Sequence, residues 1–390
     1  MTEESRCILK GMQILIDHQW VCDHAVVVEN GKIKAILQSG MIKHHLPAKI
    51  HEFPSEYYLV PGFIDLHIHG AGGKDVMDGD TEALSVISCK LAEEGVTGYL
   101  ATTMTADASD IEAVLQAVSR AMGDKQGAAI LGAHLEGPFI SSAKTGAQKE
   151  AHARTPDLKL IKHWQDTAND VIKLVTLAPE LPGAMQFITA LHNMGVIASI
   201  GHTNATYAEA VSAITAGCTQ ATHLFNAMRG LHQREPGTVG ALLLAHEVMA
   251  ELIVDGVHLH PAIVELALRL KSKDRLLLVT DAIRAKCLGD GSYELGGQMV
   301  TVTDNRAVLQ DGTLAGSTLR MPQAIKNMMQ FTKCSLADAI GMAAANPARV
   351  LKLSDHKGSI GVGKDADLVV MNASLDVVMT MREGMEVFKL

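Results

Sequence analysis

From residue 60 to residue 350, short apolar runs alternate with more polar segments that carry helix signals. Regular alternation of strands and helices is typical of α/β proteins with a parallel sheet. Eight such units in succession predict a (β/α)8 TIM-like barrel. The expected strands are Leu59–His67, Thr97–Thr103, Ala129–Leu135, Lys173–Leu177, Ile197–His202, Thr219–Phe225, Glu251–Asp255 and Leu276–Asp281.

Several segments between these runs have the residues expected at helix ends. Ser109-x-x-Glu112 and Thr206-x-x-Glu209 have the spacing of capping boxes, and Gly217 is placed to end the second of these helices. A later helix is expected to begin at Ser335-x-x-Asp338 and to end before Asn346-Pro347.

Both ends of the chain are rich in strand signals. Near the start, Asn30-Gly31 separates the run Ala25–Glu29 from the run Lys32–Leu37, and this pair favours a tight hairpin because both turn residues tolerate positive φ. An earlier run covers Ile8–Ile16, and Leu368–Met371 lies near the end. We therefore expect a small β-sandwich domain, formed by residues 1–58 and 355–390, beside a barrel domain of residues 59–354.

Chemically capable side chains stand at the ends of several expected strands. In a barrel of this kind, catalytic groups gather at the C-terminal ends of the strands. Taken singly, each of these residues has an ordinary structural explanation, as a hydrogen-bonded histidine or a capping carboxylate. Four imidazoles and two carboxylates on one rim favour a functional cluster instead. The six residues are His67, His69, Glu136, His202, His223 and Asp281.

This set of side chains suits a divalent metal ion. His67 and His69 are two residues apart on a strand, so both rings face the same side. Imidazole and carboxylate ligands favour Zn(II), Fe(II), Mn(II) or Co(II). Such an ion lowers the pKa of a bound water, and a nearby carboxylate can take the proton and return it to a leaving amine. Asp281, at the end of a very apolar strand, is the candidate for this proton transfer.

Longer motifs surround these residues. The segment PGFIDLHIHG at 61–70 and the segment GKDADLV at 363–369 resemble the opening and closing motifs of the amidohydrolase superfamily. Within that superfamily, HLEGPF at 134–139, GHT at 201–203, THLFNAM at 222–228 and LAGS at 314–317 resemble the N-acetylglucosamine-6-phosphate deacetylases. The resemblance extends from residue 8 to residue 380. It implies hydrolysis of the acetamide of N-acetylglucosamine 6-phosphate, in amino-sugar catabolism and cell-wall amino-sugar recycling.

The resemblance also implies roles for particular residues. Glu136, His202 and His223 would hold the main ion, and His67 with His69 a second one, so that one or two ions are expected per chain. Many binuclear relatives use a bridging lysine at the end of the fourth strand, but 176–180 here reads TLAPE, and Glu136 would be the bridge. The implied substrate-binding residues are Ala147, Gln148, Asn226, Ala227, Arg234, His258, Leu314, Ala315 and Gly316.

Two of these substrate positions carry further expectations. The resemblance implies that Arg234 contacts the phosphate, and a guanidinium suits this role because it matches phosphate oxygens with paired donors. In the family such an arginine reaches in from a neighbouring subunit, which implies a homodimer or a higher homo-oligomer. Some members have histidine where this chain has Gln148, and glutamine donates a hydrogen bond but carries no charge.

The composition of the chain limits the kinds of partner it can bind and the cell compartment in which we expect it. The formal net charge of -9 argues against a nucleic-acid partner, because phosphates need a basic surface. No apolar stretch reaches the roughly 18–20 residues of a membrane span. The six cysteines have irregular spacing, which predicts free thiols and a cytoplasmic protein. His44-His45 is expected in a solvated loop.

Two other functions stay open at this stage. The first is a metal hydrolase of the same fold that acts on a cyclic amide, an N-acyl amino acid or another amino sugar. The second is a scaffold relative without catalysis. Relatives of that kind usually lack ligands, whereas this chain retains all six candidates.

Overall fold

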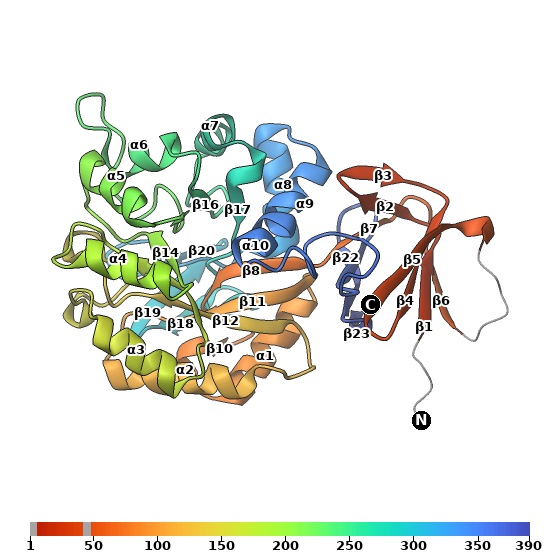
Figure 1. Ribbon diagram of the computed structural model, residues 1–390, viewed down its shortest axis with the longest axis horizontal. Helices are drawn as coiled ribbons and strands as arrows, with labels where there is room; N and C mark the ends of the chain where they lie inside the picture. The colour runs from red at the N-terminus through yellow and green to blue at the C-terminus, as the bar shows by residue number, and fades with distance from the viewer. Residues whose placement is uncertain (1–5, 42–47) are drawn as a thin grey trace.

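The computed structural model describes residues 6–41 and 48–390, and its larger part is a barrel of parallel strands (Figure 1). The eight strands of the barrel sheet follow one another in chain order. The ring closes where Ile68 and Ala282 form a parallel bridge and the Asp281 N–H donates to the His67 carbonyl oxygen at 2.8 Å. The predicted (β/α)8 barrel is therefore confirmed. Its strands are β8 (Phe63–Ile68), β11 (Val96–Thr102), β12 (Ala129–Glu136), β13 (Ile172–Leu177), β14 (Ile197–Ile200), β15 (Gln220–Ala221), β16 (Met249–Leu252) and β17 (Leu276–Leu278).

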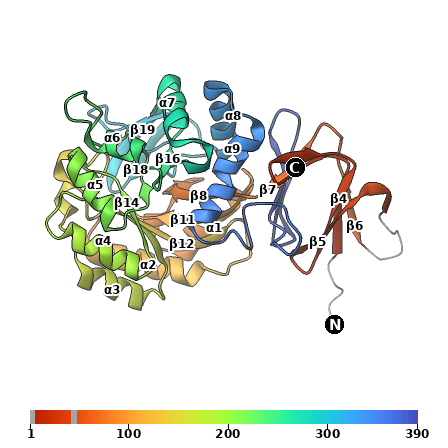
Figure 2. The same cartoon turned by 45° about the horizontal axis from the view of Figure 1, so that its top comes forward.

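Helices surround the strands and bury them on the outside, as Figure 2 shows from a second direction. Strands β8, β11 and β17 are buried along their whole length, because their outer side chains pack under helices and their inner ones fill the barrel. The helices are α1 (Thr81–Ala92), α2 (Ala108–Ala121), α3 (Leu158–Thr167), α4 (Ala184–Asn193), α5 (Tyr207–Ala216), α6 (Gly237–Leu244), α7 (Pro261–Lys271), α8 (Met321–Thr332), α9 (Leu336–Ala343) and α10 (Ala345–Val350).

The first expected strand, Leu59–His67, is wrong as a single element. The chain forms β7 (Tyr58–Pro61), which belongs to a separate sheet outside the barrel, and then β8 in the barrel, with Gly62 between them. A side chain at Gly62 would collide with Thr97, so the close approach of two strands requires glycine there. The apolar pattern continues through this junction because both strands are buried.

Two sheets built from both chain ends pack face to face beside the barrel (Figure 1). Leu9 and Val26 from one sheet and Ile14 and Leu368 from the other share a hydrophobic core. The first sheet has the order β5 (Lys32–Gln38), β4 (His24–Glu29), β1 (Arg6–Lys10), β6 (Lys49–Glu52). The second has the order β23 (Met385–Lys389), β22 (Val377–Arg382), β21 (Leu368–Met371), β7, β2 (Gln13–Ile16), β3 (Gln19–Val21).

Turns in this outer domain follow the glycine signals. Asn30 and Gly31 have φ of 51° and 78° and join β4 to β5, as predicted. The run Ile8–Ile16 is divided into β1 and β2 at Gly11, whose φ is 98°. The division into residues 1–58 with 355–390 and residues 59–354 stays a prediction, although β7 extends the outer sheet to Pro61.

The helix signals are confirmed in part. Thr206 and Glu209 form a reciprocal capping box, and Gly217 ends α5. The box at Ser109 is wrong, because Asp107 occupies the N-cap of α2 and Ser109 lies inside the helix. The Ser335 side chain accepts from the Asp338 N–H at the start of α9, and the next helix, α10, includes Asn346-Pro347.

Between β17 and α8 the chain forms a three-stranded sheet that the sequence analysis did not predict. Its strands are β18 (Gly291–Leu295), β19 (Gln298–Thr303) and β20 (Arg306–Val308). Leu295, Val300 and Ile283 pack with Met104 in a small separate core. A further short hairpin, β9 (Gly70–Ala71) with β10 (Lys74–Asp75), follows β8.

Two expectations from composition can be compared with the described residues. The six cysteines are free thiols, as predicted. Of the helices in residues 6–41 and 48–390, none has the length and apolar character that crossing a membrane needs. His44-His45 lies outside the described residues.

Candidate active site

A cavity of about 460 Å³ opens at the C-terminal ends of the barrel strands. This is the end at which barrel enzymes carry their catalytic groups. Twelve of the residues predicted from the sequence line it: His69, Glu136, Ala147, Gln148, His202, His223, Asn226, Ala227, His258, Asp281, Leu314 and Gly316.

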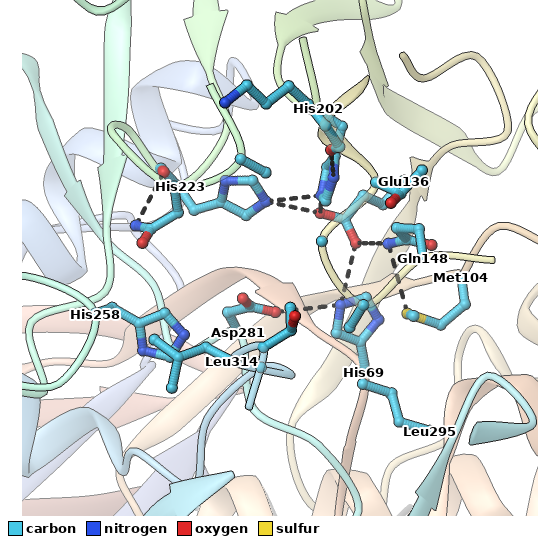
Figure 3. A pocket seen from close by; sticks show the side chains of 18 of the residues that line it. His69, Met104, Glu136, Gln148, His202, His223, His258, Asp281, Leu295 and Leu314 are labelled. Atoms are coloured by element: carbon cyan, nitrogen blue, oxygen red, sulfur yellow. Dashed lines mark hydrogen bonds and ion pairs between the residues drawn. The ribbon is translucent and has the colours of Figure 1, made fainter. Parts of the chain in front are cut away.

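Glu136, at the end of β12, lies at the centre of the buried cluster (Figure 3). Its Oε1 is 3.2 Å from His202 Nε2, 3.1 Å from His223 Nε2 and 3.3 Å from His67 Nε2. Its Oε2 is 3.3 Å from His69 Nε2. One carboxylate therefore contacts four imidazoles that come from three other strand ends.

The far side of most of these rings is fixed by a hydrogen-bond acceptor. Nδ1 of His202 lies 3.0 Å from the Lys144 carbonyl oxygen, and Nδ1 of His69 lies 3.2 Å from the Thr102 carbonyl oxygen. Nδ1 of His67 lies 3.0 Å from the Glu251 carboxylate. An acceptor at Nδ1 places the proton there and leaves the Nε2 lone pair turned toward Glu136.

Lone pairs directed at a carboxylate repel it unless a cation lies between them. The donor set of nitrogen and oxygen atoms, and its inward orientation, therefore fit a divalent metal ion. Two groups of ligand atoms around Glu136 lie close enough together to share an ion: Glu136, His202 and His223 in one, and His67, His69 and Asp281 in the other; a third group, His67, His134 and Glu251, lies behind them.

Asp281 follows β17 and faces the second of these groups. Its Oδ1 is 3.2 Å from His69 Nε2 and 3.4 Å from His67 Nε2. Burial raises the pKa of Asp281, but His67 and His69 outweigh burial and lower the pKa to about 2. The carboxylate is therefore ionised at neutral pH, as a proton acceptor must be.

The electrostatics of the whole cluster favour a positive charge at its centre. Burial lowers the pKa of His69, yet Asp281 and Glu136 raise it to about 9. Burial raises the pKa of Glu136, yet His67, His202 and His223 hold it well below its ordinary value. The carboxylates that stabilise a proton on these rings also stabilise a metal cation in its place.

Unusual backbone conformations occur at several of these strand ends. His202, His223, Ala227 and Asp281 have φ of 47°, 30°, 48° and 47°, in the left-handed region that residues with a side chain rarely adopt. Such strain persists only where surrounding structure enforces it, and it is frequent at active sites. Gly201 allows the turn before His202, since a Cβ there would lie 2.7 Å from Thr222 Cβ.

The Gln148 side chain is engaged within the cluster. Its Nε2 donates to Glu136 Oε2 at 2.6 Å, and its Oε1 accepts from the Thr105 N–H at 2.7 Å. These bonds fix which end of the amide faces the metal ligands. The implied role of Gln148 in substrate binding stays a prediction.

Three predicted residues do not line the cavity. His67 lies behind it and is fully buried, and Ala315 is also fully buried, with its N–H donating to the Ala307 carbonyl oxygen. Arg234 is exposed on the loop after β15, where its backbone N–H donates to His232 Nδ1. The structure of one chain therefore does not bring Arg234 to the other site residues.

Several residues that face the cavity were not predicted from the sequence. Lys144 and Thr145 lie in the loop after β12, beside the predicted Ala147 and Gln148. Leu295 belongs to the unpredicted sheet, and Asp311 and Thr313 lie just after β20. Gly296-Gly297, a strong hairpin signal between β18 and β19, could have identified this sheet.

Gly316 supports Asp281 from behind, which gives a testable prediction. Gly316 has φ of 59°, and a Cβ there would lie 2.8 Å from the Asp281 carbonyl oxygen and 2.6 Å from Ile283 Cγ2. Gly316→Ala should lower stability by about 1–2 kcal/mol from the backbone alone, and it should also reduce activity by displacing Asp281. Thermal melting and turnover measure the two effects.

Gly312→Ala is the matched control for this change. Gly312 has φ of 85°, but nothing lies within 4 Å of a Cβ at that position. Gly312→Ala therefore has the destabilisation that comes from positive φ but no steric collision of the new Cβ. Equal activity of the two variants would contradict the role of Gly316 in supporting Asp281.

The fold and the cluster together define a class: barrel hydrolases whose strand ends present imidazoles and carboxylates to a metal. Residues 58–387 match the model of the amidohydrolase family. The chain belongs to this family.

Several named deacetylases align with almost the whole chain. An N-acetylglucosamine-6-phosphate deacetylase of Bacillus subtilis (strain 168) is 41% identical over 97% of this chain and 96% of its own length. An N-acetylgalactosamine-6-phosphate deacetylase of Escherichia coli O157:H7 is 35% identical over 97% of this chain and 98% of its own length. A mutant N-acetyl-D-glucosamine-6-phosphate deacetylase from Mycobacterium smegmatis, solved with N-acetyl-D-glucosamine-6-phosphate, aligns with a TM-score of 0.92 and 33% identity, covering 99% of this chain and 100% of that one.

Proposed function

We propose that this protein hydrolyses the acetamide of N-acetyl-D-glucosamine 6-phosphate to D-glucosamine 6-phosphate and acetate. The observation that carries the proposal is a cluster at the rim of the barrel, in which four imidazoles converge on Glu136 and two of them also contact Asp281. The 41% identity with a deacetylase of this specificity, over nearly the whole chain, supports the choice of substrate.

Glu136, His202 and His223 would hold one divalent ion, and His67 with His69 would hold a second, with Glu136 shared between them. A Lewis acid bound there would polarise the acetyl carbonyl and make a water more acidic. Zn, Fe, Mn and Co all suit this donor set. We propose one or two ions per chain.

Asp281 would carry the proton through the reaction. Its ionised carboxylate takes a proton from the water whose oxygen bonds to the acetyl carbon. When the bond between carbon and nitrogen breaks, Asp281 delivers that proton to the departing amine. Acetic acid leaves with the water oxygen and releases its remaining proton to become acetate. The residue ends in the ionised state in which it began.

The walls of the cavity would hold the sugar. Ala147 and Gln148 lie on one side, and Leu314 with Gly316 on another, so that the sugar would lie between two loops. His258 is oriented by Asp255, whose Oδ2 lies 2.7 Å from His258 Nδ1. A fixed imidazole presents its other nitrogen to the cavity, where a sugar hydroxyl or the phosphate would bind.

A bound phosphate group needs positively charged partners, and a single chain places few of them at the cavity. Of the described residues that line the cavity, Lys144 is the one lysine or arginine. We propose that Arg234 from a second chain reaches the phosphate, and that the protein is a homodimer or a higher homo-oligomer. The asparagine and backbone of Asn226-Ala227 would add neutral donors.

Mixing two inactive variants tests this arrangement. Asp281→Asn and Arg234→Ala proteins should each be nearly inactive at low substrate concentration. A dimer formed from one chain of each has one site with both Asp281 and the neighbour's Arg234 intact. Co-refolding the two in equal amounts should therefore restore about a quarter of wild-type activity. No recovery in dimers that contain both chains would mean that Arg234 acts within its own chain or not at all.

One comparison supports N-acetylgalactosamine 6-phosphate as a second candidate substrate. A relative at 35% identity over 97% of the chain is an N-acetylgalactosamine-6-phosphate deacetylase. Acetate release from both 6-phosphates, measured side by side, distinguishes the two. We propose the glucosamine derivative as the better substrate, and the cytoplasm as the compartment in which such phosphorylated sugars occur.

A further inference from the structure

We propose that Glu251 is a positioning residue of the metal centre: it fixes His67 so that the His67–His69 half of the centre retains an ion. The inference rests on the metal centre of the proposed function. Glu251 lies in β16, below the rim, and its side chain is fully buried. Glu251 is the one charged residue in the otherwise apolar strand Met249–Leu252. A buried carboxylate at this place costs free energy unless it has partners.

The carboxylate is satisfied entirely by groups around the centre. Oε2 lies 3.0 Å from His67 Nδ1 and accepts from the His223 backbone N–H at 3.1 Å. Oε1 accepts from Gln220 Nε2 at 2.6 Å. A fully buried carboxylate is tolerated when its oxygens are hydrogen-bonded in this way. All the hydrogen bonds of Glu251 are therefore made to the strand ends that carry the candidate ligands.

These contacts reach both halves of the centre. His67 is on β8 and belongs to the group with His69, whereas His223 follows β15 and belongs to the group with Glu136. The hydrogen bond at Nδ1 keeps that proton in place and leaves His67 Nε2 as a lone pair facing Glu136 and Asp281. Partners of this kind orient a ligating histidine, and their loss typically weakens metal binding about 10–100-fold.

Glu251 also lies near His134, and the three side chains His67, His134 and Glu251 could in principle hold an ion themselves. Most of their polar atoms are already hydrogen-bonded within the described part of the chain, and the exceptions are His67 Nε2, which faces Glu136 and Asp281, and His134 Nδ1. Both Glu251 oxygens and His67 Nδ1 make the hydrogen bonds given above, and His134 Nε2 lies 2.7 Å from Thr176 Oγ1. Hydrogen bonding of these atoms to protein groups favours a supporting role over ligation.

Two small substitutions distinguish the effect of the length of the Glu251 side chain from the effect of its negative charge. Glu251→Gln keeps the length, and its oxygen can still accept from His67 and His223. Its new N–H group can donate to Gln220 Oε1, which has no hydrogen-bond partner among the described residues, once the Gln220 amide turns over. Glu251→Asp keeps the charge but is one methylene shorter, so it no longer reaches His67.

The experiment measures ion binding directly. Full-length protein is stripped with a chelator and titrated with Co²⁺, and bound ions per chain are counted by equilibrium dialysis and elemental analysis. The visible absorption of Co²⁺ reports the ligand set. Glu251→Asp should bind the second ion about 10–100-fold more weakly. The first ion should be affected less, because Glu251 contacts the backbone of His223 and not its ring. Glu251→Gln should stay within a few-fold of wild type.

Glu94→Gln is the matched control for a buried carboxylate. Glu94 is also fully buried, but it pairs with Lys286 Nζ at 2.9 Å and Arg320 Nε at 3.1 Å, away from the cavity. It should lower thermal stability without changing Co²⁺ binding. This comparison separates a loss of the ion from a general loss of stability.

Several outcomes would overturn the inference. Wild-type binding of Co²⁺ by Glu251→Asp would do so, as would a Glu251→Gln protein that loses the second ion while Glu251→Asp retains it. A wild-type protein that binds one ion only would also overturn it, yet would leave the proposed function intact. A wild-type protein that binds no ion would instead contradict the proposed function.

Discussion

Asp281→Asn is expected to lower turnover by about 10²–10⁴-fold, which is the contribution typical of a general acid and base. Asparagine has nearly the same shape but cannot accept and return a proton. Most of the ion content should remain, because Glu136, His202 and His223 form a group of ligand atoms that does not include Asp281. Steady-state acetate release and elemental analysis of the same preparation measure both.

Asp376→Asn is a suitable control, since Asp376 is in the outer domain and pairs with Lys326 at 2.8 Å. It should behave as wild type in both measurements. A fully active Asp281→Asn protein would rule out proton transfer by Asp281. An inactive protein that has also lost its ion would show that Asp281 acts mainly as a ligand.

The second large effect is expected at Glu136. Glu136→Gln keeps the shape of the side chain but removes the negative charge that four imidazoles face. Binding of the main ion should weaken by at least about 100-fold, because even residues behind the ligands contribute 10–100-fold. Activity should fall with the ion content and should recover partly at high metal concentration.

Ion titration against activity measures this effect directly. Here too Glu94→Gln serves as the control, because it removes a buried negative charge that contacts no candidate ligand. If Glu136→Gln protein bound metal and turned over substrate as wild type does, the central position of Glu136 in the metal centre would be refuted.

The barrel and most of its rim could be predicted because strand ends obey a strong spatial rule. His202 and His223 are far from Glu136 in sequence, yet parallel strands bring their C-terminal ends to one rim. The rule works for residues at strand ends. It says nothing of Glu251, which lies inside a strand and whose charge resembled an interruption of the apolar run.

Other features depended on information that local patterns do not carry. The junction between β7 and β8 is invisible in hydropathy because both strands are buried, and only the tight packing at Gly62 marks it. The sheet β18–β20 carried a hairpin signal at Gly296-Gly297, but its role in lining the cavity depends on tertiary packing. Arg234 cannot be assigned from one chain, because the proposed partner of its side chain belongs to another.

The most direct test measures acetate release from N-acetylglucosamine with and without the 6-phosphate, before and after removal of metal by a chelator. The stripped protein is reloaded separately with Zn(II), Fe(II), Mn(II) or Co(II). From the proposed function we expect turnover of the phosphorylated sugar that disappears on chelation and returns with at least one of these ions, and little turnover of the unphosphorylated sugar. Failure of every ion to support turnover of the phosphorylated sugar, or turnover that chelation leaves unchanged, would contradict it.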